Sequence, residues 1–119
     1  MKDYIIIGAG QSGLAIAYHL NKKNANYLIV DANSETGAPW LKRWDSLKLF
    51  TPSEFNSLPG MEFPYKKGHY ANKYEVADYL KAYVVKFNIQ IEFNHKITSL
   101  KKENGHFILE SEPKKFEAK

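Results

Sequence analysis

The first thirty residues place two short apolar runs on either side of a helical pattern. Residues 4–7 (Tyr-Ile-Ile-Ile) lead into Gly8-Ala9-Gly10-Gln11-Ser12-Gly13, after which apolar residues recur at the spacing of one helix face. A second apolar run, residues 27–30, ends at Asp31. The pattern predicts a strand, a glycine turn, a helix and a parallel strand, which together form a βαβ unit over residues 1–31.

Residues 33–70 have little hydrophobic periodicity and are rich in aromatic residues, proline and glycine. A stretch of this length without regular elements is more often a functional loop than filler. Its large rings are too many to leave in water, and Phe55, Phe63 and Tyr65 are expected to form a cluster beneath the loop. Arg43 and Asp45 are expected to form a local ion pair.

Helical spacing returns over residues 72–88. Asn72 with Glu75 three residues later is a variant of the capping box, so a helix is expected to begin there. Residues 89–111 then change to strand-like alternation, with a strand over residues 89–93. Asn104-Gly105 lies between two alternating runs and predicts a hairpin with a type I′ turn. We therefore expect a small antiparallel β-meander over residues 89–111.

The glycines and the acid at the second strand end suit a dinucleotide. Gly8 allows the reversal at the strand end, Gly10 leaves room for a pyrophosphate beside the backbone, and Gly13 lets the helix pack closely on the sheet. A carboxylate at Asp31 would accept hydrogen bonds from a ribose 2′-hydroxyl and repel a 2′-phosphate, which favours FAD or NAD over NADP. The alternative is a structural βαβ turn that binds no ligand.

Composition narrows the classes of function. The chain has 119 residues, 44% hydrophobic and 25% charged, which is typical of one ordinary domain. It has no cysteine, which excludes disulfide frameworks, thiol nucleophiles and dithiol redox motifs within it. No apolar run approaches the roughly 20 residues that span a bilayer. We expect a cytoplasmic protein that does not enter the membrane.

Charge and histidine placement argue against two further classes. The net charge is +4, but the lysines fall in separated doublets where element ends are expected, so a nucleic-acid partner is not expected. The four histidines have no spacing typical of metal ligands, and no metal site is assigned.

Three further motifs carry a family resemblance that covers nearly the whole chain. They are Gly37-Ala38-Pro39-Trp40, Arg43-Trp44-Asp45-Ser46-Leu47-Lys48-Leu49-Phe50-Thr51-Pro52 and Leu58-Pro59-Gly60-Met61-Glu62-Phe63-Pro64. With the glycine fingerprint, they resemble the N-terminal FAD-binding region of flavin-containing monooxygenase-like flavoproteins. Closest in pattern are bacterial flavoproteins assigned to potassium transport and the plant auxin-biosynthesis monooxygenases. The resemblance implies an α/β, Rossmann-like FAD-binding domain of three layers with a small antiparallel meander, here incomplete.

The resemblance also implies a set of cofactor-binding residues. Gly8, Gly10, Gln11, Ser12 and Gly13 would cradle the FAD pyrophosphate, and Asp31 would bind the adenosine ribose. Pro39 and Trp40 would lie on the flavin side, and Thr51 and Pro52 near the isoalloxazine. The backbone of Ile97 would contact the adenine. Animal-type flavin monooxygenases have an asparagine at the position of Pro52, and proline cannot supply its amide.

Family members are roughly three times as long and carry a second glycine fingerprint for NADPH. The resemblance implies a parent that uses FAD, NADPH and O2 to oxygenate a small molecule, with 1–119 as a single FAD-binding domain fragment, a truncated chain that is not catalytic alone. Two alternatives stay open: a stand-alone dinucleotide-binding module, either monomeric or homodimeric, and a folded relic that binds nothing. No catalytic residue is assigned.

Overall fold

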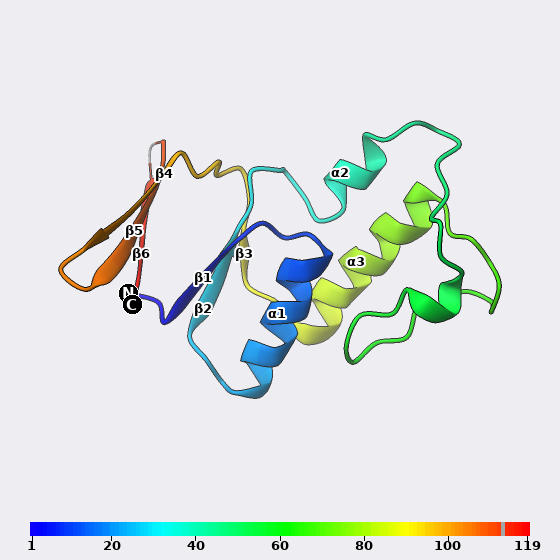
Figure 1. Cartoon of the computed structure of the whole chain (residues 1–119), viewed down its shortest axis with the longest axis horizontal. Coiled ribbons are helices and arrows are strands. Elements are labelled where there is room, and N and C mark those ends of the chain that lie inside the picture. The colour runs from blue at the N-terminus through cyan, green and yellow to red at the C-terminus, as the bar shows by residue number, and fades with distance from the viewer. Residues whose placement is uncertain (113) are drawn as a thin grey trace. The chain divides into compact units, whose positions relative to one another are not determined.

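A computed structural model describes residues 1–112 and 114–119, which fold as two compact units. One unit contains Met1–Ser34 and Ile89–Lys119, and the other contains Glu35–Asn88. The elements of both are labelled in Figure 1. The first unit is therefore discontinuous in sequence, because the second is inserted between two of its strands.

The first unit contains the expected βαβ unit. Strands β1 (Tyr4–Ile7) and β2 (Tyr27–Val30) are parallel neighbours, and helix α1 (Gln11–Lys22) connects them. A short strand, β3 (Ile91–Glu92), adds to the other edge of β2, which gives the sheet order β1-β2-β3.

A second sheet in the same unit is antiparallel. It consists of β4 (Ser99–Glu103), β5 (His106–Ser111) and β6 (Lys114–Ala118) in the order β4-β5-β6. Asn104 and Gly105 have φ angles of 49° and 83°. Positive φ at both central residues is the requirement of a type I′ turn, so the expected hairpin is confirmed.

Successive side chains of β1 and β2 point to opposite faces of the parallel sheet, and each face is covered, so the first unit has three layers. Ile5 and Leu28 pack with the buried cluster that contains Leu109 and Phe116 of the antiparallel sheet. Ile6 points to the opposite face, where it lies beside the start of α1. The order of layers, helix, parallel sheet and antiparallel sheet, confirms the expected Rossmann-like α/β fold.

Two boundaries differ from the sequence expectation. The strand expected over residues 89–93 pairs with β2 and so belongs to the parallel sheet, although it was included in the meander. Lys114–Ala118, which lies beyond the expected end of the meander at residue 111, pairs antiparallel with β5 as its last strand. Short strands take their sheet from their neighbours in space, and local alternation does not identify those neighbours.

The second unit is built on helix α3 (Lys73–Phe87), with two short helices, α2 (Ala38–Leu41) and the 3-10 helix η1 (Ser53–Phe55), in the long loop. The capping box is present: the Asn72 side chain accepts from the Glu75 N–H, and the Glu75 carboxylate accepts from the Asn72 N–H. None of the helices in the described ranges is long and apolar enough to cross a membrane.

Tyrosines of α3 hold the aromatic loop. The Tyr79 hydroxyl donates to the Met61 carbonyl at 2.6 Å and accepts from the Leu58 N–H at 2.8 Å, while the Tyr83 hydroxyl donates to the Pro59 carbonyl at 2.6 Å. Burial raises the pKa of Tyr79 above its ordinary value, so this hydroxyl, protonated at neutral pH in any case, stays a donor to a higher pH than an exposed tyrosine does.

The expected aromatic cluster forms only in part. The Phe63 ring is buried with its centroid 4.9 Å from that of Tyr79, and the Tyr65 ring lies 5.1 Å from Phe63. Phe55 is 74% exposed, so its assignment to this cluster was wrong. It lies in the single turn of η1, whose buried residue is Ser53.

Two glycines of the first turn provide a matched test of the fold. A Cβ at Gly13 would overlap the Gly8 carbonyl oxygen, whereas a Cβ at Gly10 would have no atom within 4 Å. Gly13→Ala should therefore lower the free energy of unfolding by about 1 to 3 kcal/mol. Gly10→Ala should change it little. Urea unfolding followed by circular dichroism measures both, and equal losses would contradict the close approach.

Glu75 should make the stability of the second unit depend on pH. Burial raises the pKa of its carboxyl, but hydrogen bonds from the Asn72 N–H and the His69 ring outweigh burial and hold the pKa below its ordinary value. The stabilisation is complete above about pH 4.5, the ordinary value, and is lost as the pH falls through the folded-state pKa.

Glu75→Gln should therefore cost about 1 kcal/mol at pH 7 and progressively less below pH 4.5. Thermal unfolding from pH 7 to pH 3 measures this, with exposed Glu62→Gln as the control. A Glu75→Gln deficit that stays constant over the whole range would contradict the linkage.

Candidate functional site

The glycine turn after β1 is fixed to the end of β2 by two backbone donors. The Gly8 N–H donates to the Val30 carbonyl at 2.8 Å, and the Ala9 N–H donates to Asp31 Oδ2 at 2.9 Å. Gly8 has a φ of 103°, a conformation that side chains strongly disfavour. The turn and the acid are therefore joined at the carboxyl ends of neighbouring parallel strands.

Helix α1 begins directly at this turn. Its first internal bond is from the Leu14 N–H to the Gly10 carbonyl, so the N–H groups of Gln11, Ser12 and Gly13 have no acceptor within the helix. The N-cap is Gly10, which has no capping side chain, and the first turn has no acidic residue. Such a terminus favours an anion through its N–H groups and its dipole.

The space beside Gly10 suits a phosphate group. Gly10 is exposed, and a Cβ added to it would meet nothing, so the approach to the backbone is open. The Asp31 carboxylate accepts a hydrogen bond from the Ala9 N–H of the same turn. An open, uncapped helix start with a carboxylate next to it fits the pyrophosphate and ribose of a dinucleotide.

Six of the residues expected from the sequence are thus brought together in the first unit: Gly8, Gly10, Gln11, Ser12, Gly13 and Asp31. Ile97 lies in the same unit, and its side chain packs against the core of Val30, Leu109 and Phe116. A ligand contact at Ile97 would therefore use the backbone.

The other four expected residues lie in the second unit. Pro39 and Trp40 belong to the single turn of α2, and the Arg43 guanidinium lies over the Trp40 ring, 5.4 Å from its centroid. Thr51 and Pro52 precede η1, where the Thr51 hydroxyl and carbonyl both bond to the Asn56 amide. Each pair is ordered by contacts within its own unit.

A buried lysine that the sequence did not single out supports α2. Lys73 is 3% exposed, and its Nζ donates to the carbonyls of Leu41 and Arg43 at 3.2 and 2.7 Å. It also pairs with Asp45 at 3.2 Å. Arg43 was expected from the sequence as the partner of Asp45, but the partner is Lys73. Lys73 lies about 30 residues from its acceptors, and sequence spacing carries no signal of such a contact.

Asn33 is a second residue that sequence reasoning missed. Its backbone N–H and its side-chain Nδ2 both donate to Asp31 Oδ1 at 2.9 Å. A signal was present in the sequence, because an Asp followed two positions later by a donor is the pattern of an Asx turn.

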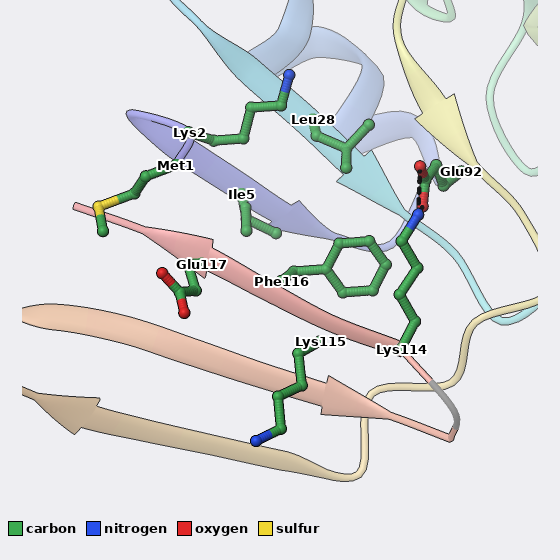
Figure 2. Close-up of a pocket in the computed structure, with 9 residues that line it drawn as sticks. All are labelled: Met1, Lys2, Ile5, Leu28, Glu92, Lys114, Lys115, Phe116 and Glu117. Carbon is green, nitrogen blue, oxygen red and sulfur yellow. Dashed lines mark hydrogen bonds and ion pairs between the residues drawn. The ribbon is translucent and has the colours of Figure 1, made fainter.

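A pocket of about 370 Å³ lies elsewhere in the first unit, between β6 and the first two strands (Figure 2). Ile5, Leu28 and Phe116 provide apolar walls, and the Lys114–Glu92 ion pair, 2.9 Å from Nζ to Oε2, lies at one end. None of the expected cofactor-binding residues lines it, so the candidate site is the glycine turn and not this pocket.

Comparisons with known proteins identify relatives of the chain. A family model described as pyridine nucleotide-disulphide oxidoreductase matches residues 5–119. The uncharacterized oxidoreductase CzcO of Bacillus subtilis is 38% identical over 119 residues, which cover all of this chain and 34% of that protein. The probable indole-3-pyruvate monooxygenase YUCCA7 of Arabidopsis thaliana is 35% identical over 98 residues, 82% of this chain and 23% of that protein.

Solved structures share the fold. A flavin-containing monooxygenase from Stenotrophomonas maltophilia superposes with a TM-score of 0.92 at 30% identity, over 98% of this chain and 36% of that chain. The bacillithiol disulfide reductase of Staphylococcus aureus reaches 0.89 at 19% identity, which shows the fold alone.

The chain spans about a third of the length of the curated bacterial relatives it matches. The resemblance to flavin monooxygenase-like flavoproteins is confirmed by the sequence relatives and by the solved structures. With a family model that matches residues 5–119, the chain belongs to the pyridine nucleotide-disulphide oxidoreductase family.

Proposed function

We propose that the first unit binds FAD through the glycine turn between β1 and α1. The observation that carries the proposal is the uncapped start of α1 at Gly10, open to a ligand and joined to Asp31 through Ala9. The N–H groups of Gln11, Ser12 and Gly13 would receive the pyrophosphate, with Gly8 shaping the turn. FAD, when bound, supplies the redox chemistry, and the protein supplies binding and orientation.

Asp31 would hold the adenosine ribose by accepting from a hydroxyl. A 2′-phosphate in the same place would meet a negative charge, so the turn favours FAD over NADP. The backbone of Ile97 would contact the adenine. Residues just before Ile97 support this placement, because they hold this segment beside Asp31. The Asn94 and His95 N–H groups donate to the carbonyls of Asn33 and Asp31, both at 2.9 Å.

The second unit would contribute residues on the flavin side, namely Pro39, Trp40, Thr51 and Pro52. Lys73 supports this role because it holds two carbonyls at and just after the end of α2, those of Leu41 and Arg43. Pro52 has no N–H to donate, so any hydrogen bond from this place to a flavin must come from Thr51 or from another residue.

For the whole protein we propose a cytoplasmic oxidoreductase of the flavin monooxygenase type that uses FAD, NADPH and a small-molecule substrate. The 119 residues contain one dinucleotide fingerprint, which is assigned to FAD. These 119 residues should therefore not oxidise NADPH by themselves.

One observation favours a second candidate, a module that associates with another copy. Strand β1 is an edge strand, and its Tyr4 and Ile7 are 53% and 56% exposed. They line an apolar pocket of about 260 Å³ with Leu100 and Phe107. Parallel sheets usually have both faces covered, and an open apolar edge can pair with another chain.

The FAD proposal is tested at Gly10. Gly10→Val places methyl groups where the pyrophosphate would approach, so FAD affinity should fall at least tenfold, which corresponds to about 1.4 kcal/mol. Quenching of flavin fluorescence on titration measures the affinity. The melting temperature without FAD should stay unchanged because the space is open. Unchanged affinity, or a wild-type chain that does not bind FAD, would contradict the proposal.

Self-association is tested at the β1 edge. If the open edge pairs with a second copy, light scattering should show a dimer, and Tyr4→Lys should shift it to monomer. Ile16→Lys is the matched control, since Ile16 is 49% exposed on α1 and does not line the pocket. A wild-type chain that remains monomeric at high concentration would rule out this second candidate.

A further inference from the structure

The Asp31 carboxylate is held by three N–H donors of its own unit. The Ala9 N–H donates to Oδ2 at 2.9 Å, and the N–H and Nδ2 of Asn33 both donate to Oδ1 at 2.9 Å. Asp31 is 9% exposed, so little water competes with these bonds. Three bonds from two directions fix the rotation of the carboxylate.

The distribution of these donors over the two oxygens is unequal. An ionised carboxylate offers about four acceptor positions, two on each oxygen. Asn33 fills both positions on Oδ1, whereas Ala9 fills one on Oδ2. One acceptor position is left, and it is on the oxygen that faces the glycine turn through its bond to Ala9.

We propose that Asn33 is a positioning residue that makes Asp31 accept a single ribose hydroxyl, through Oδ2. The inference rests on the proposed binding of FAD and adds how its ribose is recognised. Asn33 saturates Oδ1, so a vicinal diol is bound at one hydroxyl by this carboxylate instead of being gripped by both oxygens. Of the 2′- and 3′-hydroxyls, one carries the interaction.

The surrounding backbone makes Asn33 suitable for a clean substitution. Its carbonyl accepts from the Asn94 N–H at 2.9 Å, and the Asp31 N–H donates to the Glu92 carbonyl at 2.9 Å. These bonds, and the bond from the Asn33 N–H to Oδ1, remain in an alanine variant. Asn33→Ala removes only the Nδ2 bond, which frees one acceptor position on Oδ1.

The experiment measures affinity for three probes: FAD and two FAD analogues that lack either the 2′- or the 3′-hydroxyl of the adenosine ribose. For the wild-type chain, one analogue should bind about tenfold more weakly than FAD, and the other within twofold of it, since a hydrogen bond to a charged group is among the stronger ones. For Asn33→Ala, the freed position on Oδ1 can accept the second hydroxyl. The analogue that bound within twofold of FAD should then bind more weakly than FAD, and the difference between the two analogues should shrink.

The matched control is Ser34→Ala, an exposed neighbour that should leave all three affinities within twofold. Asn33→Ser retains a hydroxyl donor and should recover part of the discrimination between the two analogues. It also keeps the test decisive if the alanine variant melts early, because serine without any recovery would overturn the inference.

Three results would overturn the positioning role. They are a wild-type chain that loses affinity equally with both analogues, an Asn33→Ala variant that weakens all three probes by the same factor, and an Asn33→Ala variant with no change. A wild-type chain that binds no FAD would contradict the proposed function itself, and this inference with it. Binding of FAD with unchanged discrimination in Asn33→Ala would contradict the inference alone.

Discussion

The close approach of α1 to the end of β1 determines the geometry of the first unit. At Gly13 there is no room for a side chain, because the Gly8 carbonyl oxygen occupies that place. The approach lets the helix start within the turn, so that the Gly8 and Ala9 N–H groups point to Val30 and Asp31. Any residue larger than glycine would move the helix start, and the N–H groups offered to an anion would move with it.

In the second unit a helix, α3, supports the loop, whereas in the first unit a sheet supports the glycine turn. Lys73, in the first turn of α3, donates hydrogen bonds to carbonyls at and just after the end of α2, and the Tyr79 and Tyr83 hydroxyls donate to carbonyls of the loop near Pro59. A loop without periodicity is thus held by side chains of one well-capped helix. Substitutions on α3 should therefore change the position of loop residues such as Trp40, even where the substituted residue does not contact them.

The sequence predicted the structure correctly where it depends on residues close to one another in the chain. The glycine turn, the acid at the end of β2, the capping box and the Asn104-Gly105 turn each follow from residues a few positions apart or from a strand and helix in succession. It was insufficient where distant segments meet. Nothing local indicates that Lys73 is buried, that Phe55 is exposed, or that β3 joins the parallel sheet while β6 closes the other one.

The inserted position of the second unit has a consequence for folding. Ile5 pairs with Leu28 across 23 residues, whereas Ile29 pairs with Ile91 across 62. Closing the longer loop costs about 1 kcal/mol more in chain entropy, and the two-residue β3 returns few hydrogen bonds for it. Pairing of β3 is thereby tied to prior compaction of residues 35–88, because a compact insert shortens the effective loop that must close. The β1–β2 pair, with its local helix, has the lower contact order and the faster route to its native register.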